Sequence, residues 1–339
     1  MNLIYILGAI LAFSVLVIVH ELGHFTLAKL NGVKVEEFSL GMGPKLFGIK
    51  GKETEYLIKA LPIGGYVRML GEEEKVSDAR AFSSKSPVQK LSIIAAGPLM
   101  NFILAILMFA FIGSIRGFAL PVVDTVDKDK PAYSAGIQNG DKIIMVNNKK
   151  IKTWDDFFTE VYLANGSTMN IKLLRNGETK SIDVTPVKDT VENRYIVGIR
   201  PVLLEKPSFG QSVSYGFTQT KTIIGQTFSV LKTLFTGKAS AGDIGGPITI
   251  IKVSTKAAEQ GIIPLMAFAA YLSVQLAIFN IIPFPALDGG WIFLLLFEII
   301  TRKKLDDNKV GVLNYIGFAI LMALMVVVVI KDILYPIKL

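Results

Sequence analysis

The chain of 339 residues has only two histidines, and both lie in the segment His20-Glu-Leu-Gly-His24. Residues four apart share a face of an α-helix, so the two imidazoles could bind one metal ion with Glu21 beside it. Zinc is the usual ion for this spacing, and it lowers the pKa of a water molecule to about 7, where a neighbouring carboxylate can take the proton. The segment therefore predicts a zinc site suited to hydrolysis.

Chance is the alternative explanation of this pattern. The pattern arises by chance in on the order of one in a hundred chains of this length. Here it lies at the end of an apolar run, where polar side chains are costly in lipid, so a functional site is the better interpretation.

A catalytic zinc ion needs three protein ligands and one open position. The third ligand cannot be histidine or cysteine, because no other histidine and no cysteine is present. Asp288 is the strongest candidate, because it is the outstanding acid in the deeply apolar segments. Glu298 is the runner-up, but it lies near Arg302 and more easily reaches the membrane interface. Glu36 and Glu37 are further candidates, but they lie in a polar loop.

The residues around Asp288 predict a break in a helix. Pro283 and Pro285 precede it, and Gly289 and Gly290 follow it. Irregular backbone at membrane depth is tolerated only where it lines a cavity, so this break supports a site at Asp288.

Four long apolar runs predict membrane-spanning helices. A spanning helix needs roughly 20 residues, and four runs approach or exceed that length: residues 3–19, 91–115, 261–287 and 310–330. The mean hydropathy of +0.49 agrees. No Lys or Arg precedes the first run and no small-residue cleavage site follows it, so we interpret it as a helix of the mature protein and not a signal peptide.

The net charge of +8 does not indicate nucleic-acid binding, because the Lys and Arg residues are scattered among acids and form no basic stripe. They do indicate sidedness. Basic residues cluster in residues 31–90 and at residues 302–304, which favours the cytoplasmic side for both loops. Both termini and residues 116–260 are then expected outside.

The connecting segments have patterns of their own. Residues 55–69 predict two short strands folded back at residues 62–65. This is either a simple hairpin or one whose edge strand pairs with an unwound substrate segment, through Gly64, Gly65, Tyr66 and Val67. Residues 117–190 have Asn-Gly turns and a helical spacing over residues 154–163, which predicts a compact, mostly β domain. Residues 207–240 predict an amphipathic helix on the membrane surface or on the protein.

Three motifs carry a resemblance that covers nearly the whole chain. They are His20-Glu-x-x-His24 in the first span, Gly97-Pro-Leu-Met-Asn101 in the second and Asn280-x-x-Pro-x-Pro-x-Leu-Asp-Gly289 in the third. In the order and membrane depth of these motifs the chain resembles the site-2 protease family, specifically its RseP-type bacterial intramembrane metalloproteases. The resemblance implies that the zinc ligands are His20, His24 and Asp288.

Further roles follow from the same resemblance. It implies that Glu21 is the general base and that Asn280 hydrogen-bonds the substrate backbone. Gly97 and Asn101 then either shape the site, as Pro283 and Pro285 would, or only allow close helix packing with a cross-helix hydrogen bond. The resemblance also implies that residues 117–190 form a PDZ domain. Some relatives have two such domains in tandem, but this chain has room for one.

The predicted fold is a multi-pass α-helical membrane protein of about four transmembrane helices, with a cytoplasmic-side β-hairpin insertion and one extracytoplasmic PDZ domain. Its segments are the first transmembrane helix with the HExxH motif (1–30), a cytoplasmic loop with a membrane-associated β-hairpin (31–90), the second transmembrane helix (91–115), the PDZ domain (117–190), an amphipathic helix with a Gly-rich connector (200–260), a third, discontinuous span with the Leu-Asp-Gly motif (261–300) and the fourth helix (310–335).

The function that the resemblance implies is intramembrane zinc endopeptidase activity in the bacterial cytoplasmic membrane, with the active site near the cytoplasmic face. The expected substrates are single-span membrane proteins in regulated intramembrane proteolysis, either anti-sigma factors already cut outside or remnant signal peptides. The PDZ domain would bind the substrate or the C-terminus of a partner. A scaffold without activity is a weaker alternative because it needs no Glu21, and a metal transporter is weaker because no second relay of ligands is present.

Overall fold

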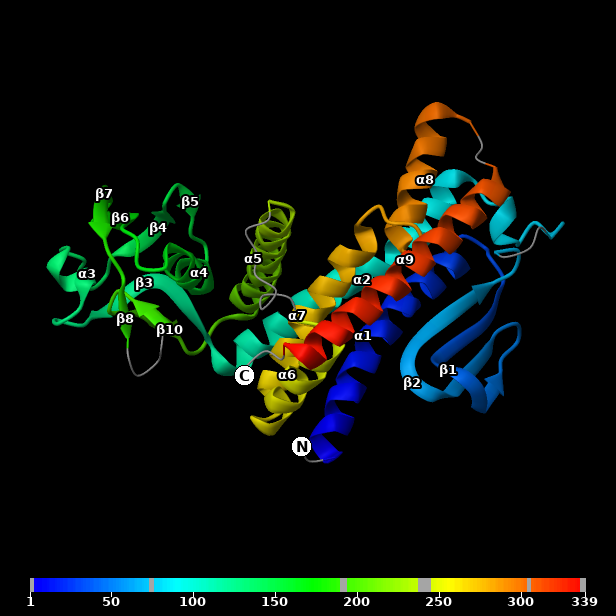
Figure 1. Cartoon of the computed structure of the whole chain (residues 1–339), viewed down its shortest axis with the longest axis horizontal. Helices are drawn as coiled ribbons and strands as arrows, with labels where there is room; N and C mark the ends of the chain where they lie inside the picture. The colour runs from blue at the N-terminus through cyan, green and yellow to red at the C-terminus, as the bar shows by residue number, and fades with distance from the viewer. Residues whose placement is uncertain (1–2, 73–75, 190–193, 237–244, 304–305, 336–339) are drawn as a thin grey trace. The chain divides into compact units, whose positions relative to one another are not determined.

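The computed structural model describes residues 3–72, 76–189, 194–236, 245–303 and 306–335 (Figure 1). The chain forms two compact units. The helical unit comprises Met1–Met108 and Ile223–Leu339, and the globular unit comprises Phe109–Thr222. Three parts of the predictions lie outside the described residues: Lys304, the end of the amphipathic helix (237–240) and the start of the Gly-rich turn before the third span (242–244).

Four helices of the described chain are long and apolar enough to cross a membrane, which confirms the predicted number of spans. They are α1 (Leu3–Leu30), α2 (Pro87–Arg116), α7 (Ile262–Ile281) and α9 (Asp307–Leu334). Only 6% of the most apolar window of α9 is buried within the chain. Such exposure of apolar side chains is expected for a helix whose solvent is lipid.

The third predicted span is discontinuous. α7 ends at Ile281, an irregular loop follows, and α8 (Asp288–Thr301) begins at Asp288. Two prolines in this loop, Pro283 and Pro285, lack backbone N–H donors and cannot continue the helix of α7. Ala286 has a φ of +72°, in the left-handed region that residues with a Cβ rarely adopt.

The segment before α7 differs from the expected connector. A helix that the sequence did not predict, α6 (Pro247–Glu259), occupies most of it. The carboxylate of Asp332 in α9 accepts hydrogen bonds from the backbone N–H groups of Gly246 and Thr249, at 3.0 Å each. The cap of α6 therefore comes from another helix, about 80 residues away in the sequence, and local periodicity contains no signal for it.

The predicted amphipathic helix is α5 (Phe209–Phe235), and its orientation is unusual. Polar residues of the helix such as Thr220 and Thr227 are buried, whereas Phe217 and Phe228 are exposed. Thr220 and Thr227 satisfy their hydroxyl groups by donating to the carbonyl oxygens of Gly216 and Ile223 in the preceding turn.

The loop after α1 contains β1 (Val35–Lys50) and β2 (Glu55–Met69), which pair with each other. The predicted hairpin over residues 55–69 is wrong in its pairing. Phe38 of β1 pairs with both Tyr56 and Val67, so the two halves of β2 flank β1 instead of pairing with each other. The reason is that the partner strand is β1, a segment in which the sequence predicts no strand.

The sheet is attached to α1 through aromatic side chains. The ring of Phe25 in α1 contacts the ring of Phe38 edge-on, with centroids 5.3 Å apart, and lies 6.2 Å from that of Tyr56. Both strands contact α1, and Figure 1 shows the sheet beside this helix. These contacts place β2 next to the helix that carries the two histidines.

The globular unit is built on one antiparallel sheet with the strand order β10-β3-β4-β6-β7. Its strands are β3 (Phe118–Val126), β4 (Lys142–Val146), β6 (Met169–Arg175), β7 (Glu178–Val184) and β10 (Ile199–Leu204), with β5 (Lys149–Lys150) paired to β4. A separate pair, β8 (Val187–Asp189) and β9 (Arg194–Ile196), and two helices, α3 (Pro131–Ser134) and α4 (Trp154–Ala164), complete the unit. The helix expected at residues 154–163 is confirmed.

The predicted end of this domain at residue 190 is wrong. β10 pairs with β3 from Ile199↔Val126 to Leu204↔Phe118, so the sheet closes only at Leu204. The sequence prediction stopped early because its turn signals end near residue 177. Inside the unit, the buried carboxylate of Asp141 accepts two hydrogen bonds from Arg175, both at 2.7 Å, which tie β6 to the loop before β4.

Candidate metal centre

Two imidazoles meet on one face of α1. His20 and His24 are both buried, and their Nε2 atoms lie 3.2 Å apart. The four-residue spacing brings them to the same side of the helix, as the sequence predicted. Neither ring faces water, so both nitrogens need a partner inside the protein.

Asp288 reaches the same point from the first turn of α8. Its Oδ2 atom lies 3.1 Å from Nε2 of His20 and 3.4 Å from Nε2 of His24. Among the residues that the structure describes, these three are the group of potential ligands whose donor atoms converge. α1 and α8 are far apart in the sequence, so the helix break before Asp288 is what directs this carboxylate into the bundle.

The three donor atoms fit a zinc ion. A tetrahedral ion about 2.0–2.1 Å from each of them would hold them roughly 3.3 Å apart, close to the observed separations of 3.1–3.4 Å. In addition, Oδ2 of Asp288 is buried and has no hydrogen-bond partner with suitable geometry. A buried carboxylate oxygen facing two imidazole nitrogens is costly unless a cation lies between them.

The far sides of both imidazoles are also held. Nδ1 of His24 lies 3.0 Å from the carbonyl oxygen of Ile93, to which its N–H can donate, leaving Nε2 free to bind a metal ion. Nδ1 of His20 lies 3.2 Å from the amide of Asn101, which is fully buried. The backbone carbonyl oxygen of Asn101 accepts a hydrogen bond from the hydroxyl group of Ser273 on α7, at 2.8 Å. The sequence contains no signal that Ile93 would contact His24. For Ser273 the signal is weak, because it is only a polar residue in an apolar helix.

α1 and α2 pack closely at one glycine from each helix, Gly23 of α1 and Gly97 of α2. A Cβ at Gly97 would lie 2.4 Å from Nε2 of His24 and 2.8 Å from Cε1 of His20. A Cβ at Gly23, between the two histidines, would lie 2.4 Å from the carbonyl oxygen of Ala96. Gly97 therefore both allows close helix packing and leaves room for the two imidazoles. Gly23 also allows the close helix packing, and the sequence analysis missed it although it lies inside the HExxH segment.

Glu21 lies on the side of α1 that faces β2. Its carboxyl group is beside the backbone N–H of Val67. A Cβ at Gly65 of β2 would lie 3.4 Å from Cγ of Glu21. The same Cβ would lie 2.8 Å from the carbonyl oxygen of Ser39 in β1, so Gly65 is enclosed by both elements. The structure thus brings Glu21 together with the predicted segment from Gly64 to Val67.

The remaining predicted positions lie around α7 and α8. Asn280 is partly buried in the last turn of α7, and its side chain has no hydrogen-bond partner within the described chain. Pro283 and Pro285 lie in the loop that leads to Asp288. Gly289 and Gly290 pack against this loop, since a Cβ would lie 2.1 Å from the carbonyl oxygen of Ile282 and 2.6 Å from that of Phe284.

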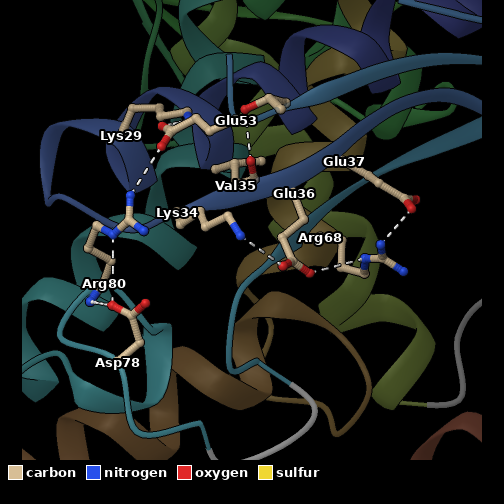
Figure 2. Close-up of polar contacts among 10 residues, drawn as sticks. Lys29, Lys34, Val35, Glu36, Glu37, Glu53, Arg68, Asp78 and Arg80 are labelled. Carbon is tan, nitrogen blue, oxygen red and sulfur yellow. Dashed lines mark hydrogen bonds and ion pairs between the residues drawn. The ribbon is translucent and has the colours of Figure 1, made fainter. Parts of the chain in front are cut away.

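The alternative acids lie away from this group of potential ligands. Glu36 pairs with Lys34 at 3.5 Å, and Arg68 pairs with Glu36 at 3.7 Å and with Glu37 at 2.6 Å (Figure 2). These residues line a charged cavity of about 680 Å³ in the loop after α1, which none of the three converging ligands borders. Glu298 lies ten residues after Asp288 on α8, about 15 Å along the helix axis.

Comparisons with known proteins find relatives that carry protease names. A protein of Clostridium acetobutylicum that carries a zinc metalloprotease name is 51% identical over all of both chains. The zinc metalloprotease RasP of Geobacillus kaustophilus is 31% identical, with 97% of each chain covered. The regulator of sigma-W protease RasP of Bacillus subtilis is 30% identical, over 97% of this chain and 98% of that protein. The alignments with the last two run over 411 and 412 positions, so both relatives carry residues that this chain lacks.

Among solved structures, the PDZ domain of an SdrC-like protein from Listeria monocytogenes is similar to 25% of this chain and 90% of that domain. The identity is 21% and the TM-score is 0.23. The family comparison is decisive, because the description of peptidase family M50 matches residues 8–324. The chain therefore belongs to peptidase family M50, the site-2 protease family, as the three motifs suggested.

Proposed function

We propose that the chain is an intramembrane zinc endopeptidase that cleaves the transmembrane segments of single-span membrane proteins. The observation that carries this proposal is the convergence of His20, His24 and Asp288 with atom separations that suit zinc. The two histidines lie on α1, which is long and apolar enough to cross a bilayer. The names of the relatives support zinc as the ion.

Zinc bound by these three residues would supply Lewis acidity, which lowers the pKa of a water molecule and polarises a peptide carbonyl group. Glu21 then serves as the general base: its carboxylate takes the proton from the attacking water and passes it to the leaving amine. The next residue on either side of Glu21 cannot do this, because His20 is a ligand and Leu22 has no ionisable group.

Asn101 and Gly97 shape the site in this proposal. A His20 ring that binds zinc through Nε2 carries its proton on Nδ1 and needs an acceptor there. Oδ1 of Asn101 is buried without a partner. A half-turn of the Asn101 amide directs this oxygen to Nδ1 of His20, so the same contact satisfies both groups.

The substrate segment has to be extended at the site, because a helix conceals its carbonyl groups in internal hydrogen bonds. The part of β2 from Gly64 to Val67 adjoins Glu21, so a substrate strand added to this edge would present its peptide bonds to the base. Asn280, partly buried in the last turn of α7, is proposed to hydrogen-bond the substrate backbone.

The proposed location is the bacterial cytoplasmic membrane, with the active site near the cytoplasmic face, the β1–β2 sheet associated with the membrane and the globular unit outside. The basic residues of the loops around β1, β2 and Arg302 support this sidedness. The globular unit is proposed to be a PDZ domain that binds the substrate or the C-terminus of a partner. Anti-sigma factors and remnant signal peptides are the proposed substrates, and the sigma-W regulator name of the Bacillus subtilis relative supports the former.

The test is a joint measurement of zinc content and cleavage on the purified, full-length protein. We expect about one zinc ion per chain and cleavage of a model single-span peptide within its apolar segment, both abolished in His24→Ala. Zinc without cleavage of any single-span peptide would contradict the proposed activity and favour a scaffold. Zinc that crosses vesicle membranes with the protein would favour a transporter.

A further inference from the structure

The loop that delivers Asp288 to the metal centre has a backbone conformation that needs support. Ala286, two residues before Asp288, has a φ of +72°, which L-residues with a side chain adopt rarely. Asp288 then begins α8, with its carboxylate 3.1 Å from His20. A small shift of this loop would move the carboxylate away from both imidazoles, so whatever holds Ala286 also positions the ligand.

The support comes from one narrow face of α9. Within residues 311–320 of this helix, Gly317 is buried and Asn314 is partly buried, whereas the other eight residues are exposed. Residues three apart share a helix face. The other residues of this stretch form an apolar surface of the kind that lipid solvates. The stretch therefore packs against the protein only through the face of Asn314 and Gly317.

Both residues of that face meet the loop directly. Oδ1 of Asn314 accepts a hydrogen bond from the backbone N–H of Ala286 at 3.3 Å. Gly317 lies against Pro285, the residue before Ala286, since a Cβ at Gly317 would be 2.5 Å from Cβ of Pro285 and 2.6 Å from its carbonyl oxygen. One residue thus satisfies the strained amide, and the other leaves room for the proline.

We propose that Asn314 and Gly317 are positioning residues of the metal centre. They hold the loop before α8 in the conformation that brings Asp288 to His20 and His24, without touching the ion themselves. This inference rests on the proposed zinc site. It gives α9, which is little buried elsewhere in its apolar window, a specific task in the chemistry.

The test measures zinc affinity by chelator competition in the full-length protein, with helix content as the measure of folding. Gly317→Ala and Asn314→Leu are expected to weaken zinc binding about tenfold or more, the scale of outer-shell effects. Asn314→Asp keeps the acceptor and should stay near wild type. Gly311→Ala is the matched control, because a Cβ at this glycine of the same helix meets nothing within 4 Å.

A second variant separates loop control from general damage. Glycine adopts positive φ without the penalty of alanine, so adding Ala286→Gly to Asn314→Leu should restore part of the lost affinity. Failure of this restoration, or wild-type affinity in both Gly317→Ala and Asn314→Leu, would overturn the inference. If His24→Ala still loses zinc in those experiments, the proposed zinc site stands and only the positioning role of Asn314 and Gly317 is overturned. A wild-type protein that binds no zinc would instead contradict the proposed function.

Discussion

Gly97 of α2 faces His24 of α1 so closely that a Cβ would lie 2.4 Å from the imidazole Nε2 atom. The position is therefore restricted to glycine by the same nitrogen that is proposed to bind zinc. A methyl group would have to displace the imidazole or the helix, because real Cβ contacts are not that short.

Gly97→Ala is accordingly expected to weaken zinc binding by about tenfold or more and to lower peptide cleavage with it. The reason is that the ring of His24 must move away from Asp288 to accommodate the methyl group. Gly8→Ala is the control, since a Cβ at Gly8 would be 3.9 Å from Leu265, an ordinary contact. Zinc affinity and activity equal to wild type in Gly97→Ala would show that the two helices separate without cost to the site.

Glu21→Gln should leave zinc bound and the fold intact but reduce cleavage by at least about a hundredfold. The amide keeps the shape of the carboxylate and its place beside Val67, but it cannot accept the proton. Zinc content and the cleavage rate of a model single-span peptide are measured on the same preparation. A normal rate would show that the base has been misassigned.

Asp288→Asn should lower both zinc retention and cleavage, because a neutral amide oxygen is a poorer ligand than a carboxylate. Among the described residues, the proposed site has two other protein ligands, His20 and His24. Glu298→Gln, on the same helix, is the control and should retain zinc. The reverse result, with zinc lost only in the Glu298 variant, would move the third ligand to that position.

Asn101→Leu is expected to weaken zinc affinity roughly 10- to 100-fold, the range found for partners of ligating histidines. Leucine fills a similar volume but cannot hold Nδ1 of His20, which lies 3.2 Å from the amide. The discriminating comparison is with Ser273→Ala, which removes only the hydrogen bond to the Asn101 backbone. Equal losses in both variants would indicate a packing role for Asn101.

The globular unit is expected to act as a gate and not as part of the catalytic centre, because none of the three converging ligands belongs to it. Replacing residues 118–204 by a short flexible linker should keep cleavage of trimmed single-span substrates and permit cleavage of untrimmed ones. The design is feasible because Phe118 pairs with Leu204, so the two ends lie side by side.

The readout is the ratio of the two cleavage rates in intact and linker-replaced enzyme, in the same membranes and at matched expression. An unchanged ratio would contradict the gate and leave the unit as a docking domain. Loss of all cleavage with zinc still bound would mean that the unit also positions the substrate.

Local features of the site could be predicted because they depend on short-range geometry. The four-residue spacing of His20 and His24 fixes both on one helix face whatever surrounds it. Asp288 was selected by composition, as an acid in an apolar segment beside helix-breaking residues, where the cost of burying charge makes a function the best explanation. The four candidate spanning helices could be predicted from length and hydropathy alone.

Long-range contacts could not be predicted, because no local pattern encodes a partner that is distant in the sequence. Tertiary structure decided that both halves of β2 pair with β1, that β10 closes the globular sheet and that Asp332 caps α6. It also decided that Gly97 lies against His24 and that Asn314 and Gly317 support the loop before Asp288. The sequence by itself determined which residues could bind a metal ion. Tertiary packing then brings those atoms within reach of one another, through α2 and α8 beside α1 and through α9 beside the loop before α8. Side-chain volume and hydrogen-bond geometry act only between surfaces in contact, so no single segment of the sequence contains this information.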